Sequence, residues 1–165
     1  MEIRQLKAAD AVKNRMLRLE ALQNKPEAFS ASYEEELAYP IETYIDRLDS
    51  ETSFTFGAFE GEELFGIATL VKESRAKLKH RSSIVGMYVS HKKRGLGAGR
   101  KLMEAAIGKA KELESIEQIH LCVISENEPA RRLYDSLGFE VYGTDKHAMK
   151  IGDHYYDEEH RILFL

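Results

Sequence analysis

The chain is poor in the residues that cross-link small secreted or metal-bound folds. It has 165 residues, a single cysteine (Cys122), three prolines and no tryptophan. One cysteine excludes an internal disulfide and a zinc site built from several cysteines. A chain of this length can bury roughly 70% of its extended surface, so it needs no cross-link to form a core. We expect one domain over residues 1–165 in a reducing, cytoplasmic setting.

The chain also lacks long apolar runs and an excess of positive charge. Lys and Arg number 24 against 28 Asp and Glu, and this net charge of −4 argues against a nucleic-acid partner. No stretch approaches the ~18 apolar residues of a membrane span, which argues against a membrane partner. Residues 1–7 alternate charged and apolar side chains, unlike a signal peptide. The hydrophobic fraction of 43% is that of a globular protein.

Hydrophobic periodicity predicts a strand, two helices, three strands and then helices alternating with strands. We expect strands at residues 3–6, 54–59, 64–71, 82–89, 119–124, 139–144 and 159–164. We expect helices at residues 8–22, 40–48, 102–113 and 130–137, with a loop and partial helix at 24–40. In the first helix, the apolar residues that recur at helical spacing and should face the core are Val12, Met16, Leu19 and Leu22.

The most informative segment joins the strand at 82–89 to the next helix. Residues 89–101 contain five Lys or Arg, no acid, and glycines at 95, 97 and 99. Glycine lets the backbone turn tightly and bring its amides close to an anion. The start of a helix adds free N–H groups and the positive end of the helix dipole. The segment is therefore a candidate phosphate-binding loop.

Two common phosphate-binding motifs do not fit this loop. A Walker loop requires Gly-Lys-Ser/Thr, whereas Gly99 is followed by Arg100 and Lys101. A dinucleotide fingerprint requires a third glycine where this sequence has Arg100 or Leu102. Taken alone, the loop also fits a glycine-rich connector with solvated lysines.

Two segments together resemble the GNAT superfamily of N-acetyltransferases. Arg94-x-x-Gly97-x-Gly99 matches that family's pyrophosphate signature, Gln/Arg-x-x-Gly-x-Gly/Ala. Residues 127–140 are similar to its second signature, an asparagine before a short helix that ends in Tyr and then Gly-Phe. The resemblance covers nearly the whole chain and implies an α/β fold of the α+β type. That fold has a mixed, mostly antiparallel sheet of about seven strands, about four helices and a splayed parallel strand pair.

The resemblance implies acetyl-CoA as co-substrate and no metal. Splayed strands leave backbone groups unpaired, and the pantetheine arm would satisfy them. By residue-by-residue transfer, the cofactor contacts are Met87, Tyr88, Val89, Arg94, Gly95, Leu96, Gly97, Ala98, Gly99 and Asn127. Tyr134 matches the family's tyrosine acid. A phenol with a pKa near ~10 is protonated at neutral pH and can donate a proton to the departing thiolate.

The general base does not follow from the resemblance. Some members carry a glutamate on the strand before the loop, but residues 82–89 contain no carboxylate and Ser83 stands at that position. The alternatives are water and four side chains: Glu34, Glu35, Tyr155 and His120. We expect His120 and Cys122 to be packed strand residues, and an acyl-cysteine route has no flanking base. The other histidines show no metal-ligand spacing in the sequence.

The acceptor is expected at residues 29–39 and 154–159, whose acids and aromatics suit a cationic amine. The sequence thus predicts an N-acetyltransferase that moves an acetyl group to a primary amine of a small molecule, amino acid or peptide by direct attack. The alternative is a non-catalytic acyl-CoA-binding sensor or interaction module of the same fold. A homodimer is compatible with either.

Overall fold

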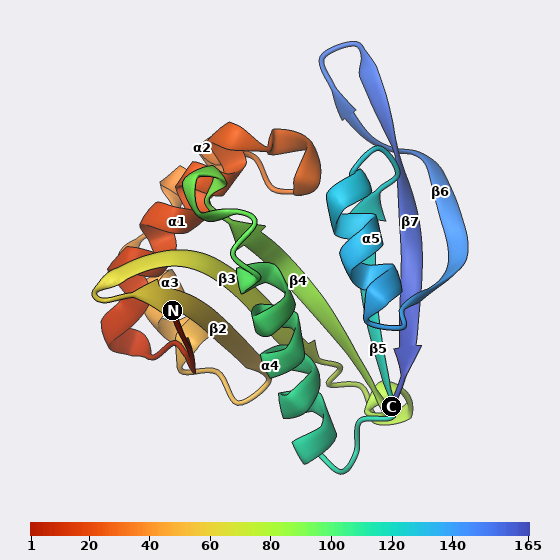
Figure 1. The fold of residues 1–165 in the computed structure, drawn as a ribbon, viewed down its shortest axis with the longest axis horizontal. Coiled ribbons are helices and arrows are strands. Elements are labelled where there is room, and N and C mark those ends of the chain that lie inside the picture. Colours follow the sequence, from red (N-terminus) through yellow and green to blue (C-terminus); the bar gives the residue numbers. More distant parts are fainter.

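The computed structural model describes residues 1–165 and builds them around one seven-stranded sheet (Figure 1). The strands are β1 (Glu2–Gln5), β2 (Ser53–Glu60), β3 (Glu63–Lys72), β4 (Arg81–Val89), β5 (Gln118–Ile124), β6 (Glu140–Ile151) and β7 (His154–Phe164). The α-helices are α1 (Ala11–Asn24), α2 (Tyr33–Ala38), α3 (Ile41–Leu48), α4 (Ala98–Glu112) and α5 (Glu128–Ser136). The predicted fold is confirmed, with five helices because the segment at 24–40 contains α2.

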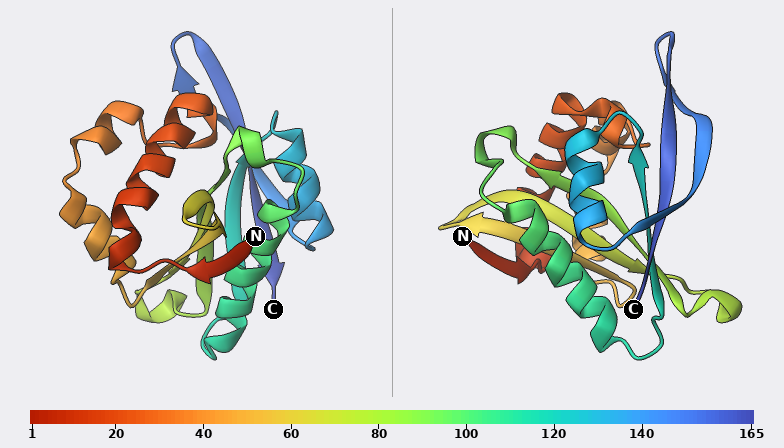
Figure 2. Two further views of the ribbon diagram at one scale, coloured as in Figure 1. Left: turned by 60° about the vertical axis from the view of Figure 1, so that its left-hand side comes forward. Right: turned by 45° about the vertical axis from the view of Figure 1, so that its right-hand side comes forward.

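The strand order is β1-β2-β3-β4-β5-β7-β6, and only β4 and β5 run parallel. Their pairing is short: it begins at Arg81 with Gln118 and ends at Ser83 with His120. Beyond that point the two strands diverge, as both Figure 1 and Figure 2 show. The predicted splayed pair is therefore present, and the rest of β4 has no partner strand on its β5 side.

Each face of the sheet has its own hydrophobic core. On one face α4 and α5 pack on the sheet through Leu102, Met103 and Tyr134, which meet strand residues such as Leu70 and Ile119. On the other face α1 and α3 bury Leu17, Leu22 and Tyr44 against Phe59 and Ile67. Figure 2 shows α1–α3 and α4–α5 on opposite sides of the strands. Because both faces are covered, β3 reads as a nearly continuous apolar run.

The predicted core face of the first helix is only partly correct, because Leu22 is buried but Val12 and Met16 are not. Val12 and Met16 are 58% and 68% exposed, whereas α1 buries Ala11, Asn14, Leu17, Ala21 and Leu22. The inner face of α1 thus includes the polar Asn14. One turn further along the helix, Arg18 faces a cavity that is described below. Apolar spacing alone therefore did not separate the buried Leu22 from the exposed Val12 and Met16.

The last two strands form a long hairpin that extends beyond the rest of the sheet (Figure 1). Its pairing runs from Glu140 with Ile162 to Ile151 with His154, with two register shifts. The hairpin exposes several aromatic and aliphatic side chains, including Tyr142 and Tyr155. None of the helices has the length and apolar character needed to cross a membrane.

Candidate active site

The candidate site begins where β4 leaves β5. Gly86 lies within β4 at φ +64°, and the β3–β4 register shifts between Ile67 and Thr69. Such a bulge bends a strand and increases its twist. A left-handed φ favours glycine, which explains the residue at this position. The bulge therefore directs the end of β4 away from β5.

The register indicates which backbone groups face the gap. The Ser90 amide donates to the Phe65 carbonyl, so Val89, opposite Gly66, belongs to a pair that exchanges no hydrogen bonds. Val89 consequently turns its N–H and C=O toward the splayed side, whereas Tyr88 turns its own toward β3. The Tyr88 hydroxyl instead connects β4 to α1, donating to Glu20 at 3.0 Å and accepting from Asn24 at 3.3 Å.

The loop before α4 presents a continuous row of free amides. Gly95 and Gly97 adopt φ values of +78° and +77°, and a Cβ at either position would meet no atom within 4 Å. No backbone amide from Arg94 through Arg100 donates a hydrogen bond within the chain, and the N-cap Gly97 supplies no side-chain cap. The row lies at the positive end of the α4 dipole, so it fits the diphosphate of an acyl-CoA.

The structure gives the loop's positive side chains different partners. Lys93 pairs with Glu60 and lies 3.9 Å from Glu63, so it points away from the row of amides. Arg100 donates to Ser136 at 2.6 Å. Arg94 turns back to donate to the Val89 carbonyl at 3.1 Å. Lys92 and Lys101 form no ion pair within the chain, so they remain available to a ligand anion.

Helix α5 forms the other wall of the gap and carries the predicted tyrosine and asparagine. Asn127 caps the helix through its Oδ1, which accepts from the Ala130 amide at 3.4 Å. Tyr134 is buried, with its ring 6.1 Å from that of Phe139. Its hydroxyl forms no hydrogen bond within the chain and is not sealed from solvent. Burial raises the pKa of Tyr134 to about 12, so the phenol holds its proton at neutral pH.

A buried arginine fixes α5 on the sheet. Arg161 of β7 is only 1% exposed and donates to Glu159 at 2.7 Å and to Asp135 of α5 at 2.5 Å. Arg131 of the same helix pairs with Glu159 at 3.0 Å. This network, which the sequence did not reveal, sets the position of Tyr134 and Asn127 relative to the strands.

A cavity of about 670 Å³ opens on the opposite face of the sheet, under α1–α3. Its strand wall includes Ser83 to Gly86 of β4 and His120 to Cys122 of β5, so the cavity reaches the point where these strands separate. Its helical wall includes Asn14, Arg18 and Arg47. The cavity and the row of amides thus lie on opposite faces of the sheet, and both adjoin the point where β4 and β5 separate.

Only one of the four proposed base residues lines this cavity. Glu34 and Glu35 are exposed on α2, and Glu35 accepts from the Ser32 amide as part of a helix cap. Tyr155 is exposed on the hairpin and stacks on His147. His120 does line the cavity, but its Nε2 lies 2.7 Å from the Gln118 Oε1 and its Nδ1 lies 3.3 Å from the Tyr142 hydroxyl.

The acidic residues that line the cavity, Glu36 and Glu158, lie in the two segments expected to hold the acceptor, although neither was among the four base candidates. Glu36 is 4% exposed and fully engaged by neighbouring side chains. Glu158 of β7 forms no hydrogen bond or ion pair of its own within the chain. It is therefore the one cavity carboxylate available to a bound amine. Glu158 belongs to the acidic segment 154–159, and no spacing signal distinguishes it within that segment.

The structure corrects two expectations about Cys122, namely that it is packed in the core and that no base flanks it. The thiol is exposed and not packed in a core, and its Sγ lies 3.3 Å from the His160 Nδ1 across the β5–β7 pair. Ligand atoms of Cys122, Glu158 and His160 lie within 4.8 Å of one another, a grouping that sequence spacing did not reveal and that could hold a metal ion. Burial, with Glu158 and Asp145 adding to it, raises the pKa of Cys122 to about 11. The thiol is thus protonated at neutral pH and a poor nucleophile.

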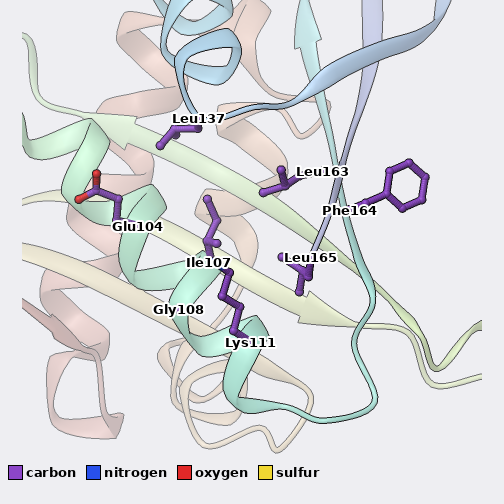
Figure 3. Close-up of a pocket in the computed structure, with 8 residues that line it drawn as sticks. All are labelled: Glu104, Ile107, Gly108, Lys111, Leu137, Leu163, Phe164 and Leu165. Carbon is purple, nitrogen blue, oxygen red and sulfur yellow. The ribbon is translucent and has the colours of Figure 1, made fainter.

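A second hollow, of about 360 Å³, lies away from these groups (Figure 3). It is formed by the C-terminal half of α4, around Ile107 and Gly108, together with Leu137 and the last residues of the chain. Its lining is mostly apolar, and none of the predicted site residues belongs to it.

Comparisons with known proteins agree with this geometry. The sequence profile of the acetyltransferase (GNAT) domain matches residues 3–159. An N-alpha-acetyltransferase from Sulfurisphaera tokodaii is 28% identical over 125 residues, which cover 72% of this chain and 75% of that protein.

Solved structures share the fold over nearly the full length. Ribosomal-protein-alanine N-acetyltransferase from Brucella melitensis superposes with a TM-score of 0.86 at 21% identity, covering 100% of both chains. The protein yncA from Salmonella typhimurium, solved with its cofactor acetyl-CoA, has a TM-score of 0.83 at 20% identity and covers 99% of this chain and 93% of its own.

Proposed function

The chain belongs to the GNAT family of acetyltransferases, and we propose that it moves the acetyl group of acetyl-CoA onto a primary amine of a small molecule, amino acid or peptide. The observation that carries this proposal is the row of free amides at residues 94–100, beside the unpaired edge of β4. A ligand that suits both features has a diphosphate at one end and an extended, hydrogen-bonding arm. Acyl-CoA has this shape and chemistry.

The cofactor-side residues would each act on one part of the bound molecule. Bound acetyl-CoA supplies an activated acetyl thioester. The amides at 94–100 bind the diphosphate, and the backbone of Met87 together with the free Val89 N–H binds the arm. The Val89 N–H polarises the acetyl carbonyl as an oxyanion donor. The Asn127 Nδ2 remains free to contact the arm, because helix capping uses only Oδ1.

The acceptor ammonium loses two protons, one before attack and one after it, while its nitrogen forms a bond to the acetyl carbon and the carbon–sulfur bond breaks. The first proton leaves toward Glu158 or water at the strand wall of the cavity. Tyr134 delivers its own proton to the departing sulfur and regains one from the nitrogen that has attacked, a role that its raised pKa suits because the phenol stays protonated. The protonated Cys122 favours direct attack over an acyl-cysteine route.

The test is release of free CoA thiol from acetyl-CoA across a panel of amines. We expect turnover with at least one amine class, and Tyr134→Phe should lower kcat on the order of 100-fold with little change in CoA affinity. Tyr155→Phe, on the exposed hairpin, is the matched control and should retain activity. Tight CoA binding without turnover, and indifference to Tyr134→Phe, would identify the non-catalytic acyl-CoA-binding module instead.

A further inference from the structure

The helical wall of the cavity carries more positive than negative charge. Three charged side chains define this wall: Arg18 of α1, Glu36 of α2 and Arg47 of α3. Two guanidinium groups therefore face one carboxylate. A cationic amine alone, which the sequence favoured, does not account for this wall.

The single carboxylate is already engaged. Glu36 Oε2 accepts from the Tyr44 hydroxyl at 2.5 Å and from the Arg47 Nη1 at 3.3 Å. Arg18 reaches the same carboxylate only through its Nε, which lies 3.6 Å from Oε1. That separation exceeds hydrogen-bond distance, so Arg18 contributes charge to the cluster without a hydrogen-bonded partner.

Arg18 is poorly solvated as well as incompletely paired. Its side chain is 19% exposed, and the guanidinium lies 4.7 Å above the Phe29 ring. No hydrogen bond within the chain involves its guanidinium. Burial lowers the pKa of Arg18 from its ordinary value, with Glu36 opposing that effect. A partly desolvated guanidinium with free N–H donors is suited to a carboxylate or another anion, which it binds in a bidentate fork.

The guanidinium lies beside the reactive end of the cavity. Its Nη1 is 3.8 Å from the position that a Cβ on Gly86 would occupy, at the bulge where β4 separates from β5. The strand wall across the cavity carries the unpaired Glu158. An acceptor with both an amine and an anion can therefore place the anion on Arg18 and turn its amine toward the strand wall.

We propose that Arg18 binds an anionic group of the acceptor, so that the preferred substrates are amines with a carboxylate a few bonds away. This inference rests on the proposed acetyl transfer and names its substrate class. The carboxylate can come from two sources: the main chain of a free amino acid, or an acidic side chain near the N-terminus of a peptide.

The test compares acceptors that differ only in the anion. Each free L-amino acid is assayed beside its amide, and dipeptides that begin with Asp or Glu are assayed beside those that begin with Asn or Gln. Arg18→Gln should raise KM for the preferred anionic acceptor by about 10- to 100-fold, as expected for loss of charge-assisted hydrogen bonds. It should leave the amide's kcat/KM nearly unchanged, and Arg18→Lys should restore part of the loss.

Arg75→Gln is the matched control, because Arg75 is exposed at the far end of the β3–β4 hairpin and loses the same charge. Equal kcat/KM for acids and amides, or an Arg18→Gln loss that is the same for both, overturns the inference while the proposed function stands. Preference for the acidic dipeptides over free amino acids assigns the anion to a peptide.

If no amine is acetylated, the proposed function fails and the inference is decided by binding alone. Calorimetry of the CoA-loaded protein with each amino acid and its amide then measures the same difference. Carboxylate-dependent binding that Arg18→Gln abolishes supports the anion site without turnover. Its absence overturns the site.

Discussion

The two sides of the splayed strands offer a ligand different kinds of groups. On the proposed cofactor side the free groups are mainly backbone, namely the amides at 94–100 and the Val89 N–H. On the proposed acceptor side they are side chains from separate elements that meet in one cavity, namely Arg18 and Glu158. A backbone site tolerates most side-chain changes away from its glycines, whereas one substitution can alter a side-chain site.

The largest predicted effect concerns the anchor of the cofactor side. Arg161→Met removes the buried guanidinium that holds α5 to β7 and leaves Glu159, itself 8% exposed, with Arg131 alone. We expect a loss of about 3 kcal/mol or more in the free energy of unfolding, because a buried charge loses its partner. Denaturant titration measures the loss. CoA affinity should also fall, since α5 positions Tyr134 and Asn127.

A double variant separates the charge from the packing. The double variant Arg161→Met, Glu159→Gln also removes the buried carboxylate that has lost one of its two arginine partners. Part of the lost free energy of unfolding should therefore return. If the single variant costs no more than a surface substitution, the network does not anchor α5. The cofactor side would then depend on the loop alone.

A smaller effect is expected from Gly97→Val at the row of amides. The β-branched side chain disfavours the φ of +77° and would occupy the open space in front of the amides. We expect CoA affinity to fall by about 10- to 100-fold, the range for lost hydrogen bonds to a charged ligand. Calorimetry with CoA measures the change. The ratio of kcat/KM for a free amino acid to that for its amide should stay constant, because the variant does not alter the acceptor cavity.

Gly108→Ala in the same helix is the matched control. Gly108 has no positive φ, and an added Cβ would meet no atom within 4 Å. This variant should retain CoA affinity and gain roughly 0.5–1 kcal/mol in stability, because alanine favours a helix interior. Unchanged CoA affinity in Gly97→Val would contradict the assignment of the cofactor side.

The groups of the proposed cofactor side could be recognised in the sequence because they lie close together in it. Glycines at 95, 97 and 99 and the basic residues beside them lie within one short segment, and the asparagine and tyrosine of α5 lie within another. Even here the sequence did not indicate that Lys93 and Arg100 have partners within the chain. Those contacts depend on strands and helices that are distant in sequence.

The acceptor side could be predicted only as two segments, 29–39 and 154–159, because the residues of the cavity meet only after folding. Arg18, Glu36, Arg47 and Glu158 come from four elements and share no motif. The one available signal was the polar inner face of α1, and apolar periodicity grouped the exposed Val12 and Met16 with the buried Leu22. The same holds for Cys122 and His160, which adjoin only through the register of β5 with β7.

The smallest predicted effect concerns the anchor of the acceptor side. Asp10 precedes α1, and its carboxylate accepts from both Nη atoms of Arg4 at 2.8 Å and from the Lys7 amide at 2.9 Å. The Arg4 hydrogen bonds lower the pKa of Asp10 to about 2. A lowered folded pKa means that the ion pair stabilises the fold above about pH 4. That stability is lost as the pH falls from about 4 toward 2.

Asp10→Asn should therefore cost about 1–2 kcal/mol at neutral pH, less than the pKa shift alone implies because Arg4 is partly exposed. The difference from the parent chain should shrink as the pH approaches 2, where the parent loses the same interaction. Urea titrations across this range measure it, with Glu114→Gln as a control at an exposed carboxylate. A difference that stays constant with pH would show that Asp10 acts by helix capping and not by its charge. The position of α1, and with it that of Arg18, would then not depend on the charge of Asp10.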